Sequence, residues 1–163
     1  MMYPLFPLPL PGSDKTLNNG GTAEEQIFNL FQVTGNVELL ALGCTVRTAL
    51  AAGLTLAYFD LWDGTASIPL TLNNGVISSL PKGSWFGKTG LAAATMAIAS
   101  SAAGALTTHA SEQNIFKRVI LTQKAGTATY IRFRYTSAGA STGVITPYAR
   151  WAPAGVTGVL VPV

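Results

Sequence analysis

Charged side chains are scarce in this chain. Lysine, arginine, aspartate and glutamate make up 10% of its 163 residues, whereas 48% of the residues are hydrophobic. In an ordinary globular domain about a quarter of the residues are charged, and that surface charge keeps a free monomer soluble. The composition therefore predicts a single domain whose surface is largely covered by other subunits.

Cysteine and histidine occur once each, as Cys44 and His109. A single cysteine excludes an internal disulfide and a multi-cysteine zinc site, and the apolar surroundings of Cys44 indicate a buried, unreactive thiol. Any catalytic group that needs histidine depends on His109, which lies in a polar stretch typical of a surface loop. We therefore expect the chain not to be an enzyme.

The sequence contains no metal-binding or nucleotide-binding motif with the required residue spacing. Glu38, Asp60 and Asp63 could meet near strand ends, but they do not follow the ligand pattern of a calcium loop. Pairing with arginine accounts for Glu38 and Asp60, and Asp63 fits an Asp-Gly turn. The segment Gly83–Thr89 resembles a phosphate-binding loop, yet its glycines are separated by three residues, two of them bulky aromatics, where that loop has four. No metal, nucleotide or other cofactor is predicted.

Long hydrophobic runs and concentrated positive charge are also missing. The most apolar window, Leu91–Leu106, is rich in small residues and shorter than the roughly 20 apolar residues of a membrane-spanning helix. The N-terminus has neither the basic region nor the cleavage site of a signal peptide. The net charge of +3 is spread out, unlike the clustered charge of a nucleic-acid binder. We expect the chain to stay in the cytoplasm of the cell that makes it, and to bind neither membrane nor nucleic acid.

The clearest pattern that is present is an alternation of apolar and polar residues at 129–136, typical of a strand with one buried and one solvated face. Segments 115–123 and 144–151 also predict strands, and the connections 124–128 and 137–143 are small and contain glycine. The three segments predict an antiparallel meander at the centre of the fold. One face of the middle strand carries Ile131, Phe133 and Tyr135, and the other carries Tyr130, Arg132, Arg134 and Thr136.

Further strand patterns, separated by turn signals, extend over the first half of the chain. They lie at 27–34, 37–50, 54–62, 66–72 and 76–80, with Pro69 restricting the fourth to an edge or a bulge. We also interpret Leu91–Thr108 as irregular strands. About ten short strands favour an all-β fold, an antiparallel sandwich or a jelly roll, with extended N- and C-terminal arms.

The two ends look unlike the body. Residues 1–21 begin with prolines alternating with large apolar residues, which predicts an extended, polyproline-like arm followed by a hinge at 13–22. The arm either packs across its own domain or lies on a neighbouring subunit, and the second is favoured because such segments are preformed ligands. The predicted body spans 22–155. Residues 156–163 form an apolar tail that we interpret as another intersubunit contact.

Basic residues on the predicted meander suggest a docking surface. Arg132 and Arg134 share a strand face, and Lys117 or Arg118 with Arg150 could flank them. This face is either merely solvated or docks on an acidic partner. Carbohydrate binding by aromatic side chains is a further option, although no cluster of Asp or Asn accompanies the candidates Trp62, Trp85 and Trp151.

Two stretches carry a resemblance to a known class of proteins. Ile27–Leu40 contains Val-Thr-Gly-Asn leading into a long apolar strand, and Tyr148–Pro153 is an aromatic strand that ends in Trp-Ala-Pro. Both resemble small all-β proteins encoded among the head genes of tailed bacteriophages. The resemblance implies a capsid decoration (cement) protein, often a jelly-roll trimer seated on the major capsid protein at the virion surface. It implies no catalytic residues.

The first hypothesis is therefore a structural virion protein, a homotrimer that binds and stabilises the assembled capsid lattice. The alternative is a receptor- or glycan-binding fibre or tail module, and a third hypothesis is a hydrolase that uses His109. The residues predicted to bind the partner are Tyr3, Leu5, Phe6, Leu8, Leu10, Arg132, Arg134, Arg150, Val159, Leu160 and Val161.

Overall fold

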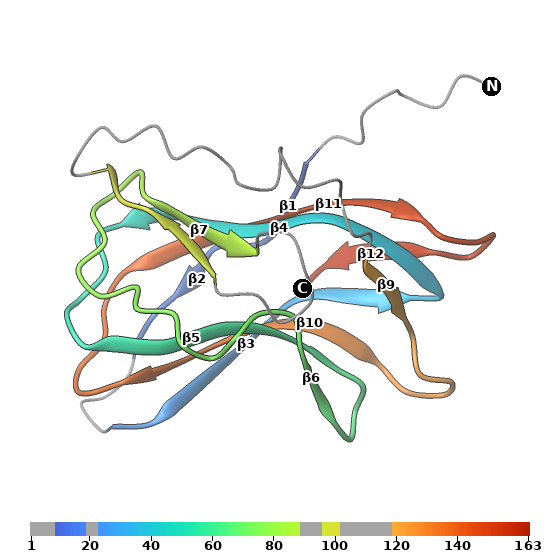
Figure 1. Cartoon of the computed structure of the whole chain (residues 1–163), viewed down its shortest axis with the longest axis horizontal. Coiled ribbons are helices and arrows are strands. Elements are labelled where there is room, and N and C mark those ends of the chain that lie inside the picture. The colour runs from blue at the N-terminus through green and yellow to red at the C-terminus, as the bar shows by residue number, and fades with distance from the viewer. Residues whose placement is uncertain (1–8, 19–22, 89–95, 102–118) are drawn as a thin grey trace.

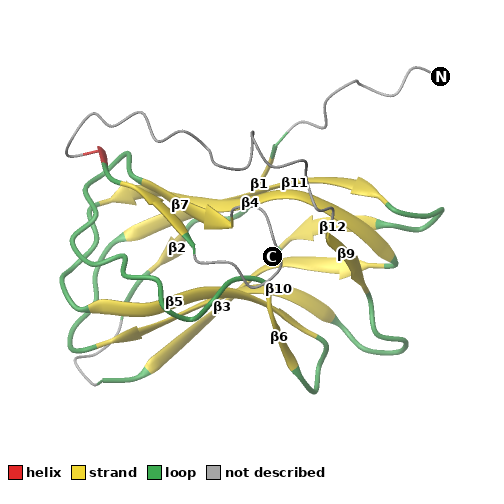
Figure 2. Cartoon of the chain, viewed as in Figure 1, coloured by secondary structure: helices red, strands yellow, loops and turns green. Residues whose placement is uncertain are grey.

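The computed structural model describes residues 9–18, 23–88, 96–101 and 119–163. These residues form two antiparallel β-sheets packed face to face, with no α-helix among them (Figures 1 and 2). The predicted all-β antiparallel sandwich is confirmed, and its topology is compatible with a jelly roll. Within the described ranges no helix has the length and apolarity needed to span a membrane.

One sheet has five strands and the other has seven. The five-stranded sheet runs in the order β12 (Val159–Pro162), β3 (Glu25–Thr34), β10 (Thr129–Ser137), β5 (Leu54–Trp62) and β6 (Ser67–Pro69). The seven-stranded sheet runs β1 (Leu10–Pro11), β11 (Val144–Pro153), β4 (Asn36–Thr48), β7 (Trp85–Lys88) and β8 (Ala97–Ala99), with β2 (Lys15–Thr16) also paired to β11 and β9 (Val119–Thr122) to β4.

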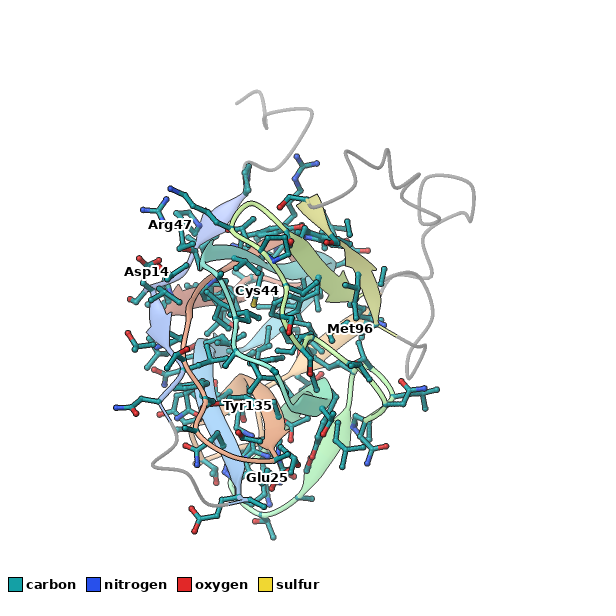
Figure 3. All side chains as sticks on the ribbon, turned by 90° about the vertical axis from the view of Figure 1, so that its left-hand side faces the viewer. Asp14, Glu25, Cys44, Arg47, Met96 and Tyr135 are labelled. Carbon is teal, nitrogen blue, oxygen red and sulfur yellow. The ribbon has the colours of Figure 1, made fainter. Side chains whose placement is uncertain are left out.

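Apolar side chains from both sheets fill the space between them (Figure 3). The alternation predicted for β10 is confirmed, because Ile131, Phe133 and Tyr135 are all fully buried. The ring of Phe133 lies 5.3 Å from that of Phe59, its neighbour on β5, and 5.3 Å from that of Phe86 on β7 in the opposite sheet. Aromatic rings at these distances add about 0.5–1.5 kcal/mol per pair beyond the area that they bury.

The predicted meander of three consecutive strands is wrong. β9 and β11 both pair with β4 in the seven-stranded sheet, whereas β10 pairs with β3 and β5 in the other sheet. The connections 123–128 and 138–143 therefore cross from one sheet to the other. A few extended residues, at roughly 3.3 Å each, span the roughly 10 Å between packed sheets. A short connection that contains glycine can therefore form either a hairpin within one sheet or a crossing between two sheets.

The junction between the predicted strands 27–34 and 37–50 is another such crossing. Gly35, with φ of 63°, is all that separates β3 in one sheet from β4 in the other. A β-carbon at Gly35 would lie 2.6 Å from the carbonyl oxygen of Thr157. Both the left-handed backbone and the close approach therefore require glycine here.

The described part of the N-terminal segment packs on its own domain. Leu10 and Pro11 pair with β11, Lys15 and Thr16 pair with the same strand, and Leu17 is buried in the core. The predicted boundary at residue 21 and the predicted hinge are therefore wrong for residues 10–17, where backbone pairing replaces free extension. Residues 1–8 lie outside the described part of the chain.

The predicted C-terminal tail is also part of the body. β12 pairs with β3 from Val159 opposite Thr34 to Pro162 opposite Phe31, and Leu160 is buried. Segment 76–80, predicted as a strand, makes no ladder; an isolated bridge joins Ala57 to Gly75 instead. Most of Leu91–Thr108 lies outside the described residues, which include only β8 and its immediate neighbours there.

We expect Phe133→Ala to lower the free energy of unfolding by roughly 3–5 kcal/mol, because it leaves a cavity among three aromatic rings. Ile120→Ala is the matched control, since Ile120 is exposed on β9 and its truncation should change stability by less than about 0.5 kcal/mol. Urea unfolding of the two variants measures the difference. Equal losses would contradict the placement of the core.

Candidate interaction surface

Four charged side chains meet on the outer face of the five-stranded sheet. Arg132 and Arg134 extend from β10, with Asp60 on β5 and Glu25 on β3. The strand register explains the cluster, because Arg132 lies directly opposite Asp60, and Thr136, two residues beyond Arg134, lies opposite Glu25. Strand pairing thus brings together residues that are far apart in the sequence.

Arg132 and Asp60 form a buried, two-point ion pair. Nε of Arg132 donates to Oδ1 of Asp60 at 2.9 Å, and Nη2 donates to Oδ2 at 2.5 Å. The Asp60 side chain is fully buried and that of Arg132 is 8% exposed. The hydroxyl of Ser67 on β6 also donates to Asp60. The expected pairing of Asp60 with an arginine is confirmed.

Arg134 extends the network toward the sheet edge. It pairs with Glu25 and lies 3.3 Å from Asp60, and its guanidinium stands 5.2 Å from the ring centroid of Tyr58. Partial burial opposes the charged form of Arg134, but the hydrogen bonds to Glu25 and Asp60 outweigh it and raise the pKa of the guanidinium. Its Nε is buried and has no hydrogen-bond partner within the described residues.

These contacts correct the prediction of a basic docking face. Two acidic groups neutralise Arg132 and Arg134, and Arg132 is too deeply buried to reach a partner. Arg150 is exposed on β11 in the other sheet, so it does not join them. Lys117 and Arg118 lie outside the described residues.

The tryptophans do not assemble into one aromatic platform. Trp62 lies on β5, and the guanidinium of Arg132 stands 4.4 Å from its ring centroid, which occupies one face of the indole. Trp85 and Trp151 lie on β7 and β11 of the opposite sheet. The indole N–H of Trp85 donates to the hydroxyl of Tyr148, and burial raises the pKa of that hydroxyl.

The C-terminal strand β12 is apolar, in contrast to the charged cluster on the same sheet. β12 forms one edge of the five-stranded sheet and consists of Val-Leu-Val-Pro, with no charged residue. Val159 and Val161 are 43% and 47% exposed, while Leu160 between them belongs to the core. Edge strands usually carry charges or bulges that prevent pairing with another chain. β12 has neither, and its protection consists of its short length of four residues and of Pro162 at its end.

The structure thus divides the predicted partner-binding residues into three groups. Val159, Val161 and Arg150 are exposed. Leu10 is partly buried against the core, and Leu160, Arg132 and Arg134 serve contacts within the chain. Tyr3, Leu5, Phe6 and Leu8 lie outside the described residues.

Comparisons of the chain with protein-family models, with curated proteins and with solved structures found no match. In the described residues no group of three or more His, Cys, Asp or Glu side chains lies close enough to hold a metal ion. Cys44 is fully buried as predicted, and burial raises the pKa of its thiol well above the ordinary value. Functional inference therefore depends on the exposed surfaces.

We expect Arg132→Met to lower the free energy of unfolding by roughly 3–5 kcal/mol, because it removes the two-point partner of a buried carboxylate. The double variant Arg132→Met/Asp60→Leu should be more stable than the single variant, since the unpaired charge is then absent. Urea unfolding tests both. A loss below about 1 kcal/mol for Arg132→Met, typical of surface pairs, would contradict a buried network.

Proposed function

We propose that this chain is a structural protein of a virus particle, a capsid decoration protein that attaches to the assembled major capsid protein lattice at the virion surface. The observation that carries the proposal is the exposed and uncharged edge strand β12 in a chain of which only 10% is charged. A protein that attaches to a capsid needs a folded domain with an exposed apolar surface, and the edge strand β12 supplies that surface.

Strand addition explains how such an edge would bind. A partner strand would hydrogen-bond to the free side of β12 while Val159 and Val161 contact apolar side chains, a common mode of protein recognition. Lys15 on β2 donates to the backbone carbonyl of Val163 at 2.7 Å, which holds the strand at its end. β12 is thereby ordered before a partner arrives, so binding loses little conformational entropy.

The N-terminal segment supplies a second proposed contact. Residues 1–8 contain Tyr3, Leu5, Phe6 and Leu8 between prolines, and they lead directly into β1, which is fixed to β11. The resemblance of Ile27–Leu40 and Tyr148–Pro153 to phage head proteins supports the virion assignment and the trimeric state. Binding only to the assembled lattice would stabilise the shell by mass action.

The alternative is a receptor- or glycan-binding fibre module. Trp62 next to Asp60 is the described arrangement closest to a sugar site. However, the Arg132 guanidinium already covers one face of Trp62, and Asp60 is fully buried. Trp62 and Asp60 therefore stabilise the sheet and are not available to bind a sugar. This favours a role in assembly over a role in receptor binding.

We expect the double variant Val159→Lys/Val161→Lys to reduce occupancy on capsids at least about tenfold, because two charges on the edge oppose strand addition. Each valine is about half exposed, so the isolated chain should stay folded. Ile120→Lys is the matched control, since Ile120 is an exposed aliphatic residue in a strand of the other sheet. Sedimentation of capsids with bound protein measures occupancy.

Equal occupancy of the double variant and the wild type would contradict the β12 assignment. Loss of occupancy with Ile120→Lys as well would indicate a general effect of added charge instead. If the wild-type chain adsorbed to host cells or to glycans and ignored capsids, the receptor-binding alternative would replace the decoration proposal.

We also expect deletion of residues 1–8 to weaken capsid attachment while leaving the thermal unfolding midpoint within a few degrees of the wild type. The cut falls before β1, so every described strand remains. A deletion through residue 21 is unsuitable because it removes β1, β2 and the buried Leu17. Full attachment of the shortened chain, measured by the same sedimentation assay, would contradict a role for the arm.

A further inference from the structure

An asparagine followed by glycine lies in the segment between β6 and β7, which is green in Figure 1 and is bridged to β5. Asn74 is exposed in a turn, whereas the next residue, Gly75, is buried. Asparagine deamidates most readily before glycine, because glycine has no side chain to obstruct the approach of its backbone nitrogen to the asparagine side chain. The pair therefore joins a reactive side-chain amide to a backbone that the fold holds in place.

Deamidation begins at the backbone nitrogen of Gly75. This nitrogen loses its proton to hydroxide and bonds to Cγ of Asn74, and the bond from Cγ to the side-chain nitrogen breaks. That nitrogen takes a proton from water and leaves as ammonia. Water then opens the cyclic succinimide at either of its carbonyl groups, which gives aspartate or isoaspartate. The reaction needs only water, and no oxidant or reductant takes part.

The fold holds the attacking nitrogen in a hydrogen bond. The N–H of Gly75 donates to the carbonyl of Ala57 on β5 at 3.1 Å, and the N–H of Ala57 donates to the carbonyl of Gly75 at 2.8 Å. These two bonds form an isolated bridge and not a ladder. A nitrogen fixed in this way cannot turn toward the side chain of Asn74. The reaction therefore requires the bridge to open, which is a local event and not a global unfolding.

A strained residue lies next to the bridge. Leu56 precedes Ala57 and has a φ of 49°, in the left-handed region that only one other described non-glycine residue occupies. It coincides with a bulge in β5, where the register against β10 shifts between Arg134 and Thr136. A side chain in this conformation is strained and persists only where the surrounding pairing enforces it. Opening of the bridge releases part of that strain, so the strain favours opening.

The isoaspartate product does not fit the closed bridge. Isoaspartate inserts an additional carbon atom into the backbone immediately before Gly75. The space around Gly75 is already filled, since a β-carbon there would lie 2.5 Å from the carbonyl oxygen of Ala57 and 2.5 Å from the terminal methyl group of Met96. The lengthened backbone therefore displaces Gly75 from Ala57, and the two hydrogen bonds of the bridge are lost.

We propose that Asn74 is a deamidation site controlled by the Ala57–Gly75 bridge. Asn74 reacts when the bridge opens, and its isoaspartate product keeps the bridge open. The modification also places a negative charge in residues 64–81, which contain no charged side chain. The extent of deamidation thus records how long this part of the chain has been open. The proposal does not depend on attachment to a capsid.

The rate of deamidation in the full-length chain tests the control by the bridge. The folded protein and the same protein unfolded in urea are incubated at mildly alkaline pH, and peptide mapping by mass spectrometry measures the converted fraction of Asn74. We expect conversion to be at least about tenfold slower in the folded chain, because the bridge is open for only a small fraction of the time. Equal rates in the two states would overturn the proposal.

Two variants provide the controls for this measurement. Asn74→Gln keeps an amide but forms the larger cyclic imide far more slowly, so the peptide should stay unmodified in both states; modification at the normal rate would place the reaction elsewhere. Leu56→Gly removes the strain, since glycine adopts the left-handed conformation freely. It should slow conversion in the folded chain about twofold or more and leave the rate in urea unchanged. An unchanged or faster rate in the folded chain would contradict the role of strain.

Asn74→Asp separates the new charge from the lengthened backbone. This variant carries the charge of the product on a normal backbone, so it should melt close to the wild-type temperature. The isoaspartate form, purified from aged protein, should melt at least about 2 °C lower. Equal melting temperatures of the isoaspartate form and Asn74→Asp would contradict the claim that the product keeps the bridge open.

Discussion

Burial of apolar side chains between two sheets is the interaction on which the rest of the structure depends. Phe133 and Phe59 from the five-stranded sheet meet Phe86 from the seven-stranded sheet, with ring centroids 5.3 to 6.3 Å apart. A sheet exposes its backbone groups only at its edges and buries one of its two faces. Once the inner faces are joined, both outer faces and the edge strands remain available for contacts with other molecules.

The outer face of the five-stranded sheet is organised differently in its middle and at one side. In the middle, Arg132, Arg134, Asp60 and Glu25 neutralise one another, so this region attracts neither acidic nor basic partners. At one side lie the exposed valines of β12. The surface suited to contact is therefore apolar, in agreement with the low charge of the whole chain.

Much of the strand content could be predicted from the sequence, because alternation in β10 and the continuous apolar run of β4 are local properties. Strand pairing could not, because a connection such as 123–128 is long enough either for a hairpin or for a crossing between sheets. The burial of Arg132 and its ion pair with Asp60 could not be predicted from the sequence either. Its alternation with Phe133 assigns it to the outer face, but only the register of β10 against β5 reveals the carboxylate of Asp60 opposite it. The strain at Leu56 has no counterpart in composition or periodicity, since it arises from a bulge that depends on three-dimensional pairing.

The central claim is that neighbouring molecules cover the uncharged edge strand β12 of the five-stranded sheet. Backbone hydrogen exchange, compared between the protein in its native assembly and the same protein after dissociation to monomers, tests this most directly. The account predicts that amides of residues 159–161 are protected in the assembly and exchange faster in the free chain, while the core of β10 exchanges slowly in both. Equal exchange of this segment in both states would contradict it.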